Sequence, residues 1–253
     1  MNAKNHEADS DLLTRAHVVP FAVFMGFLIL LQLASSLIGW DHPDAPWWRR
    51  QPAQWVYPVQ VIVTLGFLLR YWKCYRFDWS LKWSLVAVVF GAVGIGFWLL
   101  PTTLYDAWGM QGEATEWLKR LGFAARREGF DPGIFEHPAA YWSSLIMRFV
   151  RAVIVVALVE EIFWRGFLMR FLVREDFEKV RIGEFQWKAF LLVAVFFMLV
   201  HSMADWPAAF LCGLVYNFVA VKTGSLAACV VAHSLTNLGL GAYIMATRQW
   251  GFW

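Results

Sequence analysis

The run Val159-Glu160-Glu161-Ile162-Phe163-Trp164-Arg165-Gly166 places two adjacent carboxylates within an apolar stretch that begins at Ala152. A charged side chain at the centre of a membrane helix costs at least about 2.5 kcal/mol, so the charges found there commonly mark function. The stretch therefore predicts a membrane-spanning helix, and the Glu160–Glu161 pair within it is the first candidate site.

The composition of the whole chain indicates an integral membrane protein. Of its residues, 59% are apolar and only 16% are charged, and its mean hydropathy is +0.49. Soluble domains average about 45–50% apolar and about 25% charged residues. The net charge of +3 is small, and Lys and Arg lie in short clusters between apolar runs. This distribution suits membrane topology, so we expect no nucleic-acid partner.

Seven segments are apolar enough to predict membrane helices, each of which needs roughly 20 residues to cross the bilayer. They cover residues 17–39, 53–72, 83–100, 141–172, 187–203, 207–222 and 225–246. Tryptophans cluster near the segment ends, as amphipathic rings do at a membrane interface. No internal repeat or soluble linker interrupts the pattern. We predict an all-α, polytopic membrane helix bundle of about seven transmembrane helices, forming one integral membrane domain over residues 1–253.

The loops predict the orientation of this bundle. Lys and Arg are more frequent in the loops on the side of the N-terminus than in those on the opposite side. Because cytoplasmic loops are enriched in these residues, we expect the N-terminus to be cytoplasmic. In the loop 101–140, Trp117, Leu118, Leu121 and Ala125 have helical spacing beside charged residues. This pattern fits an amphipathic helix on the outer membrane surface, or a solvated loop.

Polar side chains also interrupt three of the apolar segments. Glu160 and Glu161 lie in the fourth, His201 lies near the end of the fifth, and His233 and Asn237 lie in the seventh. Residues four apart share one face of a helix, so His233 and Asn237 are expected to point the same way. Together, these positions predict a polar cavity inside the membrane.

Glu161 and Arg165 are also four residues apart, with the acid N-terminal to the base. This spacing favours an ion pair along one helix. Adjacent helical residues diverge by about 100°, so Glu160 points away from Glu161. The simplest interpretation is that Arg165 neutralises Glu161 while Glu160 faces the polar cavity.

The side chains at these positions are suited to the attack of water on an amide. The carboxylate of Glu160 can accept a proton from water, and His201 can orient that water. An imidazole N–H of His233 and the amide of Asn237 can stabilise the oxyanion that forms. We therefore predict a catalytic site made of Glu160, His201, His233 and Asn237.

Three motifs carry a resemblance to a known family. Glu160-Glu161-x-x-x-Arg165, Phe197-x-x-x-His201 and His233-x-x-x-Asn237 occur in order, each on its own apolar segment. This pattern resembles the CAAX-prenyl-endopeptidase and bacteriocin-processing (CPBP) intramembrane proteases. The resemblance covers residues 141–245 approximately. More loosely, the chain is similar to the CAAX-protease-related proteins found beside bacterial exosortase systems.

The resemblance implies an intramembrane, glutamate-type endopeptidase that cleaves a membrane-associated protein or peptide. Glu160 would activate water, His201 would assist it, and His233 with Asn237 would form the oxyanion site. Glu161, Arg165 and Phe197 would have supporting roles, and no metal or other cofactor would be needed. We expect a multi-pass protein of a cell membrane, specifically the bacterial inner membrane, with the lipid bilayer and its peptide substrate as partners.

Two alternatives stay open. Glu160, His201 and His233 are a possible zinc ligand set, since two His and one carboxylate with an open position form a known catalytic centre. The chain lacks His-Glu-x-x-His, so these ligands would come from three separate segments. The same polar residues would also suit the proton or substrate path of a transporter, or a non-enzymatic membrane scaffold.

Overall fold

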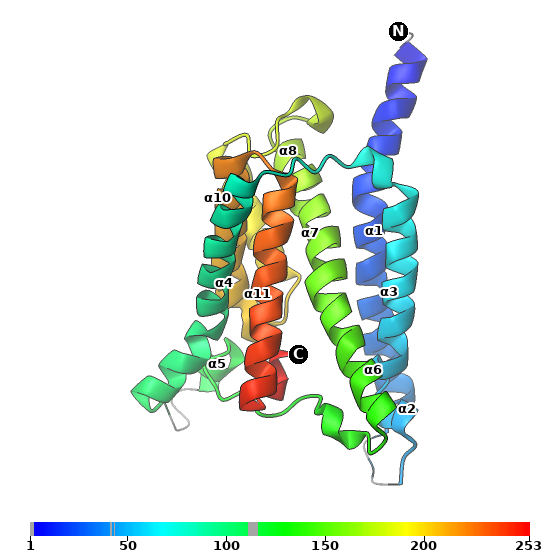
Figure 1. Ribbon diagram of the computed structural model, residues 1–253, viewed down its shortest axis with the longest axis vertical. Coiled ribbons are helices and arrows are strands. Elements are labelled where there is room, and N and C mark those ends of the chain that lie inside the picture. The colour runs from blue at the N-terminus through cyan, green and yellow to red at the C-terminus, as the bar shows by residue number, and fades with distance from the viewer. Residues whose placement is uncertain (1–2, 41, 43, 111–115) are drawn as a thin grey trace. The chain divides into compact units, whose positions relative to one another are not determined.

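The computed structural model describes residues 3–40, 42, 44–110 and 116–253, and every regular element in that part of the chain is a helix (Figure 1). The chain divides into two compact units. Unit 1 comprises Met1–Arg76 and Pro132–Phe163, and unit 2 comprises Phe77–Asp131 and Trp164–Trp253. The boundary at Phe163 lies within one continuous helical stretch, Pro138–Phe171. The prediction of a single membrane domain stays a prediction.

Unit 1 is built from long helices that lie side by side. In chain order its helices are α1 (Ala3–Ile38), α2 (Trp47–Arg50), α3 (Ala53–Arg70), a 3-10 turn (Trp72–Cys74), a 3-10 turn (Pro132–Ile134), α6 (Pro138–Phe149), a π-helical turn (Val150–Val156) and α7 (Ala157–Phe163). Helix α1 packs against both α3 and α7 (Figure 1). A buried glutamine joins α3 to α1, because Gln60 Nε2 donates to the Phe24 carbonyl at 2.8 Å.

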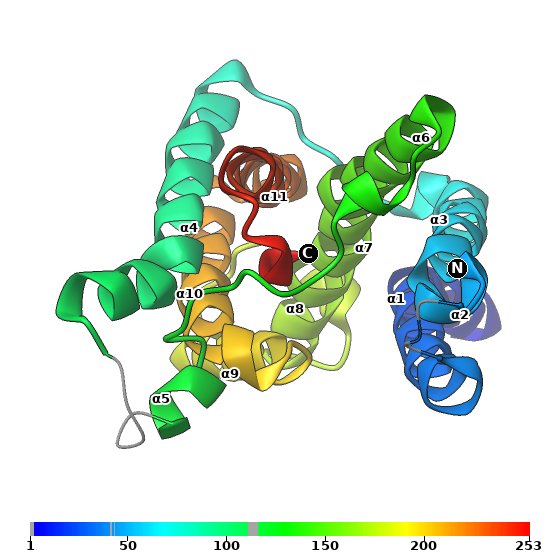
Figure 2. The same ribbon diagram turned by 90° about the horizontal axis from the view of Figure 1, so that it is seen from below.

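Unit 2 contains the remaining helices. They are α4 (Leu81–Trp108), α5 (Glu116–Arg120), a π-helical turn (Trp164–Leu168), α8 (Met169–Phe171), a 3-10 turn (Phe177–Lys179), α9 (Trp187–Leu199), a 3-10 turn (Met203–Asp205), α10 (Trp206–Thr223), α11 (Leu226–Thr247) and a 3-10 turn (Trp250–Phe252). Helix α4 packs against α11 and α10, and α10 packs in turn against α9 (Figure 2).

Small residues bring α4 and α11 close together. A Cβ atom added at Gly94 would lie 2.5 Å from Thr236 Oγ1, and one at Gly91 would lie 2.8 Å from the Ala232 carbonyl oxygen. The Thr236 hydroxyl donates to the Gly91 carbonyl at 3.0 Å. Close backbone approach at small residues is a common way for membrane helices to pack. This contact fixes α11, the helix that carries His233.

The prediction of about seven transmembrane helices is confirmed only in part. Helices occur in all seven predicted segments, but five helices among the described residues are long and apolar enough to cross a membrane. They are Ser10–Ile38, Leu81–Trp108, Pro138–Phe171, Met203–Thr223 and Leu226–Thr247. Helix α9 has 13 residues, or about 20 Å at 1.5 Å per residue, which is short of a bilayer core of about 30 Å. Helix α3 carries two glutamines and ends in Arg70, which lowers its hydropathy.

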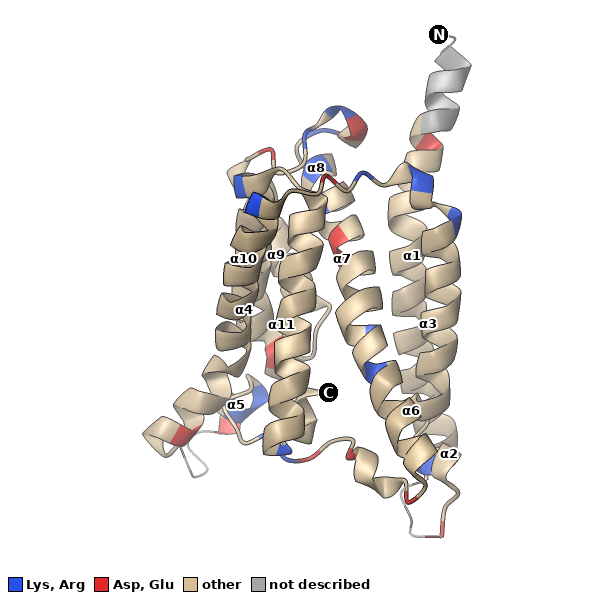
Figure 3. Ribbon diagram, viewed as in Figure 1, with Lys and Arg blue, Asp and Glu red and all other residues tan. Residues whose placement is uncertain are grey.

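Charge distribution supports a multi-pass membrane protein. Most charged residues lie near helix ends or in the connecting segments, and the stretch Pro138–Phe171 is the exception, since charged residues occur along its length (Figure 3). Five spanning helices of this kind indicate that the chain crosses the membrane several times. The cytoplasmic location of the N-terminus stays a prediction.

The loop 101–140 differs from its prediction. Helix α4 continues through Pro101 to Trp108, so the loop begins later than residue 101. The predicted amphipathic helix is only the short α5, Glu116–Arg120, and does not reach Ala125. Gly122 has a φ of +85°, a backbone conformation that turns the chain out of the helix. Residues 111–115 lie outside the described part of the chain.

Candidate active site

The two glutamates lie on α7 between two π-helical turns. The turn Val150–Val156 precedes α7, and the turn Trp164–Leu168 follows it. In a π-helical turn, the backbone hydrogen bond skips one more residue than in an α-helix, and such turns are frequent at functional sites. The irregular backbone thus coincides with the motif that contains the two acids.

Both glutamates are buried, with exposed fractions of 5% for Glu160 and 0% for Glu161. Within the described part of the chain, Glu160 Oε2 is buried and has no hydrogen-bond partner. Arg151, two and a half turns earlier, interacts electrostatically with Glu160. An ionised Glu160 would therefore be stabilised by a cation of its own unit while keeping an oxygen available to accept a hydrogen bond.

Arg165 is completely buried and is held by α10. Its Nε donates to Asn217 Oδ1 at 2.9 Å, and its Nη2 donates to the Gly213 carbonyl at 3.0 Å. The guanidinium also lies 5.1 Å from the ring centroid of Phe197 and 5.3 Å from that of Tyr216. The expected ion pair between Arg165 and Glu161 stays a prediction.

Phe197 is the residue around which unit 2 brings the two histidines together. Its ring is fully buried and lies 4.8 Å from the His201 ring and 6.0 Å from the His233 ring, centroid to centroid. These distances are typical of aromatic contacts. Phe197 therefore fixes the positions of both imidazoles as well as that of Arg165.

His201 lies just after the end of α9, and its ring orientation is set by the backbone. Its Nδ1 lies 2.6 Å from the Phe197 carbonyl oxygen. A carbonyl oxygen can only accept, so Nδ1 carries the proton and donates. In the neutral imidazole, the lone pair then belongs to Nε2. His201 can therefore accept a proton or a hydrogen bond through Nε2.

His233 and Asn237 lie on α11, which is a regular α-helix over this range. Their four-residue spacing therefore puts them on one helix face. His233 is buried, with a 4% exposed fraction, and Asn237 is half-buried. The His233 ring stacks on Tyr216 with a centroid distance of 4.8 Å and an interplanar angle of 19°. Because Glu160 belongs to unit 1, its predicted meeting with these residues stays a prediction.

Two supporting residues are not indicated by the three motifs. Tyr216 stacks on His233, and Asn217 accepts from Arg165 and donates through Nδ2 to the Phe190 carbonyl at 2.8 Å. Both lie in the apolar segment 207–222. The sequence does contain a signal for Asn217, since an Asn within a membrane helix commonly forms a hydrogen bond to a neighbouring helix.

An ion pair anchors the turn after His201. Arg126 donates from Nη1 to Asp205 Oδ1 and from Nη2 to the Ala204 carbonyl. The Arg126 backbone N–H donates to Gln249 Oε1 at 2.9 Å, and Gly251 N–H donates to the Arg126 carbonyl at 2.9 Å. The segment around Arg126 thus ties the chain end to the turn that follows His201.

Among the described residues, no group of three or more His, Cys, Asp or Glu side chains is arranged to hold a metal ion. The glutamate mechanism and the zinc alternative both stay predictions.

Comparison with known families identifies the central part of the chain. Residues 142–239 match the model of the family described as Type II CAAX prenyl endopeptidase Rce1-like. These residues form an Rce1-like domain of the CPBP family. No curated protein and no solved structure matched the chain. The resemblance inferred from the three motifs is confirmed.

The Rce1-like domain contains every residue of the three motifs, from Glu160 to Asn237. A domain of this kind implies a CAAX-type endopeptidase, and therefore a protein or peptide substrate.

Proposed function

We propose that this protein is an intramembrane endopeptidase that hydrolyses a peptide bond of a membrane-associated protein or peptide. The observation that carries the proposal is the Rce1-like match over residues 142–239, which includes all three motifs. The gathering of His201, His233 and Arg165 around Phe197 supports it, because the second and third motifs then share one centre.

In the proposed reaction, Glu160 takes a proton from a water molecule as the water oxygen attacks the scissile carbonyl carbon. The lone pair on His201 Nε2 accepts a hydrogen bond from this water and orients it. His233 and Asn237 donate hydrogen bonds to the oxyanion of the tetrahedral intermediate. When the C–N bond breaks, protonated Glu160 returns its proton to the leaving amine, and an acid and an amine are released.

The supporting residues have separate parts in this proposal. Arg165, held by Asn217 and Gly213, keeps a positive charge next to the imidazole cluster. Such preorganised charge stabilises an anionic transition state more effectively at a dry site than in water. Tyr216 and Phe197 keep the two imidazoles in place by ring contacts, so that neither has to reorient during the reaction.

The test compares the protein termini of cells that express the wild-type chain with those of cells that express Glu160→Gln. A peptide that is processed only by the wild type is then incubated with the purified protein in liposomes. Glu160→Gln keeps the shape of the side chain but cannot accept the proton. Turnover should therefore fall by roughly 10²–10⁴-fold, the usual contribution of a general base.

Glu175→Gln is the matched control, since Glu175 is exposed in the loop after α8 and should behave like wild type. Melting temperatures in detergent show whether each variant is folded. Full turnover by folded Glu160→Gln would refute the glutamate mechanism, and unchanged termini would favour the transporter or scaffold. The zinc alternative instead predicts stoichiometric zinc in the purified protein and loss of turnover on chelation.

A further inference from the structure

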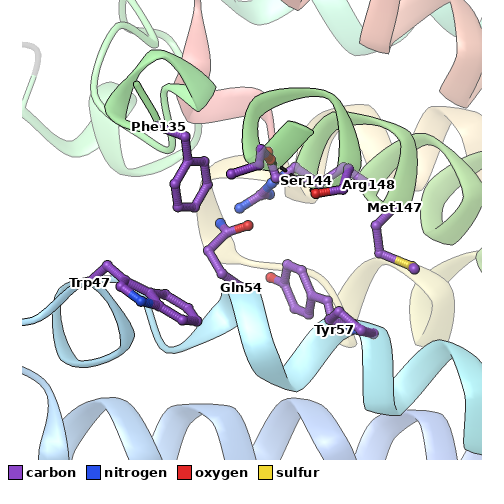
Figure 4. Close-up of a pocket in the computed structure, with 10 residues that line it drawn as sticks. Trp47, Gln54, Tyr57, Phe135, Ser144, Met147 and Arg148 are labelled. Carbon is purple, nitrogen blue, oxygen red and sulfur yellow. Dashed lines mark hydrogen bonds between the residues drawn. The ribbon is translucent and has the colours of Figure 1, made fainter. Parts of the chain in front are cut away.

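Unit 1 contains a cavity that has no part in the proposed reaction. Its volume is about 510 Å³, and it lies between the α2–α3 region and α6 (Figure 4). Gln54 and Tyr57 extend from α3 into the space that α6 borders with Ser144, Met147 and Arg148. Trp47 and Phe135 enclose one end of it. This volume is within the range of small-molecule binding sites, about 300–1,000 Å³.

The polar groups of the cavity are suited to an anion. Arg148 is 8% exposed and supplies a positive charge, and the residues that line the cavity include no carboxylate. Gln54 Nε2 is a buried donor that has no hydrogen-bond partner in the described part of the chain. Burying an amide donor without a partner is unfavourable, so a ligand that accepts a hydrogen bond from Gln54 would remove this cost.

The rest of the lining is suited to an apolar chain. Trp47, Pro58, Phe135 and Met147 present rings and a thioether to the cavity. Methionine is flexible and adapts to irregular apolar ligands. The complementary ligand is therefore an amphiphile, with an acceptor-rich anionic head and at least one hydrocarbon chain.

The location of the cavity matches the headgroup region of a membrane. Trp40, Trp48 and Trp55 lie near it in sequence and are exposed, and Arg49 lies over the rings of Trp40 and Trp48 at 5.1 and 6.0 Å. Exposed tryptophans of this kind are typical of the membrane–water interface. Helical side chains tilt toward the helix N-terminus, so the Arg148 side chain extends toward the start of α6.

We propose that this cavity binds one anionic glycerophospholipid, whose phosphate accepts hydrogen bonds from Gln54 and Arg148. The acyl chain lies along the apolar lining. The phosphate contacts come from α3 and α6, and none of the residues that line the cavity has a part in the proposed peptidase reaction.

The probe is phosphatidylglycerol, offered to the purified full-length chain together with an equal amount of phosphatidylcholine that has the same acyl chains. Native mass spectrometry counts the lipids that stay bound after detergent washing. Wild type should retain one phosphatidylglycerol with about a tenfold preference, and Arg148→Gln should lose most of it, because a charge-assisted hydrogen bond is removed. Arg70→Gln makes the same change at an exposed site at the end of α3 and should keep the preference.

Two further variants keep the proposal testable if Arg148→Gln fails to fold. Gln54→Leu removes the donor without burying a new polar group, and it should lower the preference for phosphatidylglycerol about threefold or more. Ser144→Phe fills the cavity and should lower the retention of both lipids. Equal retention of the two lipids by wild type, or an unchanged preference in Gln54→Leu and Arg148→Gln, would overturn the proposal. Displacement of the lipid by millimolar inorganic phosphate would also overturn it, since the site would then recognise the anion alone.

Discussion

Arg165 Nε donates to Asn217 Oδ1 at 2.9 Å, and both side chains are completely buried. This bond links the first motif to α10, a helix that carries none of the three motifs. Asn217 also donates to the Phe190 carbonyl, so one amide connects Arg165 to α9 as well. A buried charge that loses a partner is strongly destabilising, because its desolvation is no longer compensated.

Asn217→Leu should therefore destabilise the protein by roughly 2–3 kcal/mol, the cost of a lost hydrogen bond to a charged group. The measurement is the melting temperature of the detergent-solubilised protein. Asn217→Asp is the matched variant, since it keeps the acceptor for Arg165 and loses only the donor to Phe190. It should melt between wild type and Asn217→Leu. If Asn217→Leu melted like wild type, Asn217 would have no supporting role.

Arg165→Ala should lower both the melting temperature and the turnover. It removes two hydrogen bonds to α10 and two contacts with aromatic rings, together with the charge that is expected to neutralise Glu161. Arg165→Lys keeps the charge but not the fork of donors, so it should recover only part of the stability. A fully stable but inactive Arg165→Ala would instead assign this residue to substrate binding.

Packing of α4 against α11 gives a prediction with a control on the same helix. Gly94→Ala puts a Cβ atom 2.5 Å from Thr236 Oγ1, so either the Thr236 side chain or the helices themselves have to shift. Overpacking of this kind costs roughly 1–3 kcal/mol. Gly96 lies two residues later with nothing within 4 Å of an added Cβ atom. Gly96→Ala should be neutral or slightly stabilising, because alanine is the better helix former. Equal melting temperatures for the two variants would show that the close contact is not required.

The sequence predicted the helices well and their internal irregularities poorly. Apolar length alone located a helix in each of the seven predicted segments, because the bilayer constrains backbone and composition together. The π-helical turns on either side of α7 were missed, since one extra residue per turn hardly changes an apolar pattern. The extension of α4 past Pro101 was missed because proline usually ends or kinks a helix.

For the candidate site too, the sequence predicts some features and not others. The motif residues stand out because polar groups are rare in apolar segments, and the Rce1-like match confirms the family that they indicated. The contacts of Phe197 with both histidines could not be derived from spacing, since they depend on how α9 and α11 pack around α10. Tyr216 was overlooked for the same reason, because nothing in its own segment shows that His233 stacks on it.

The oxyanion role assigned to α11 predicts a selective loss of turnover. His233→Ala and Asn237→Ala should each lower turnover by roughly 10²–10³-fold, as the removal of one oxyanion donor does. His233→Ala should also lower the melting temperature, because it removes the ring that stacks on Tyr216. Leu238→Ala changes an exposed neighbour on the same helix and serves as the control. Near-normal turnover by a folded Asn237→Ala would argue against its place in the oxyanion site.

His201 allows its two ring nitrogens to be tested separately. The amide nitrogen of asparagine lies near the position of Nδ1, whereas that of glutamine reaches toward Nε2. Because Nδ1 donates to the Phe197 carbonyl, His201→Asn should keep this contact and melt close to wild type. The Asn side chain has no group at the position of Nε2, so the turnover of His201→Asn in liposomes should fall by about 10²-fold or more, as for the loss of a general acid–base group. His201→Gln should melt lower, because its amide cannot easily donate back to Phe197. If His201→Asn kept full turnover, His201 would serve only to end α9, and the water would have to be oriented by another residue.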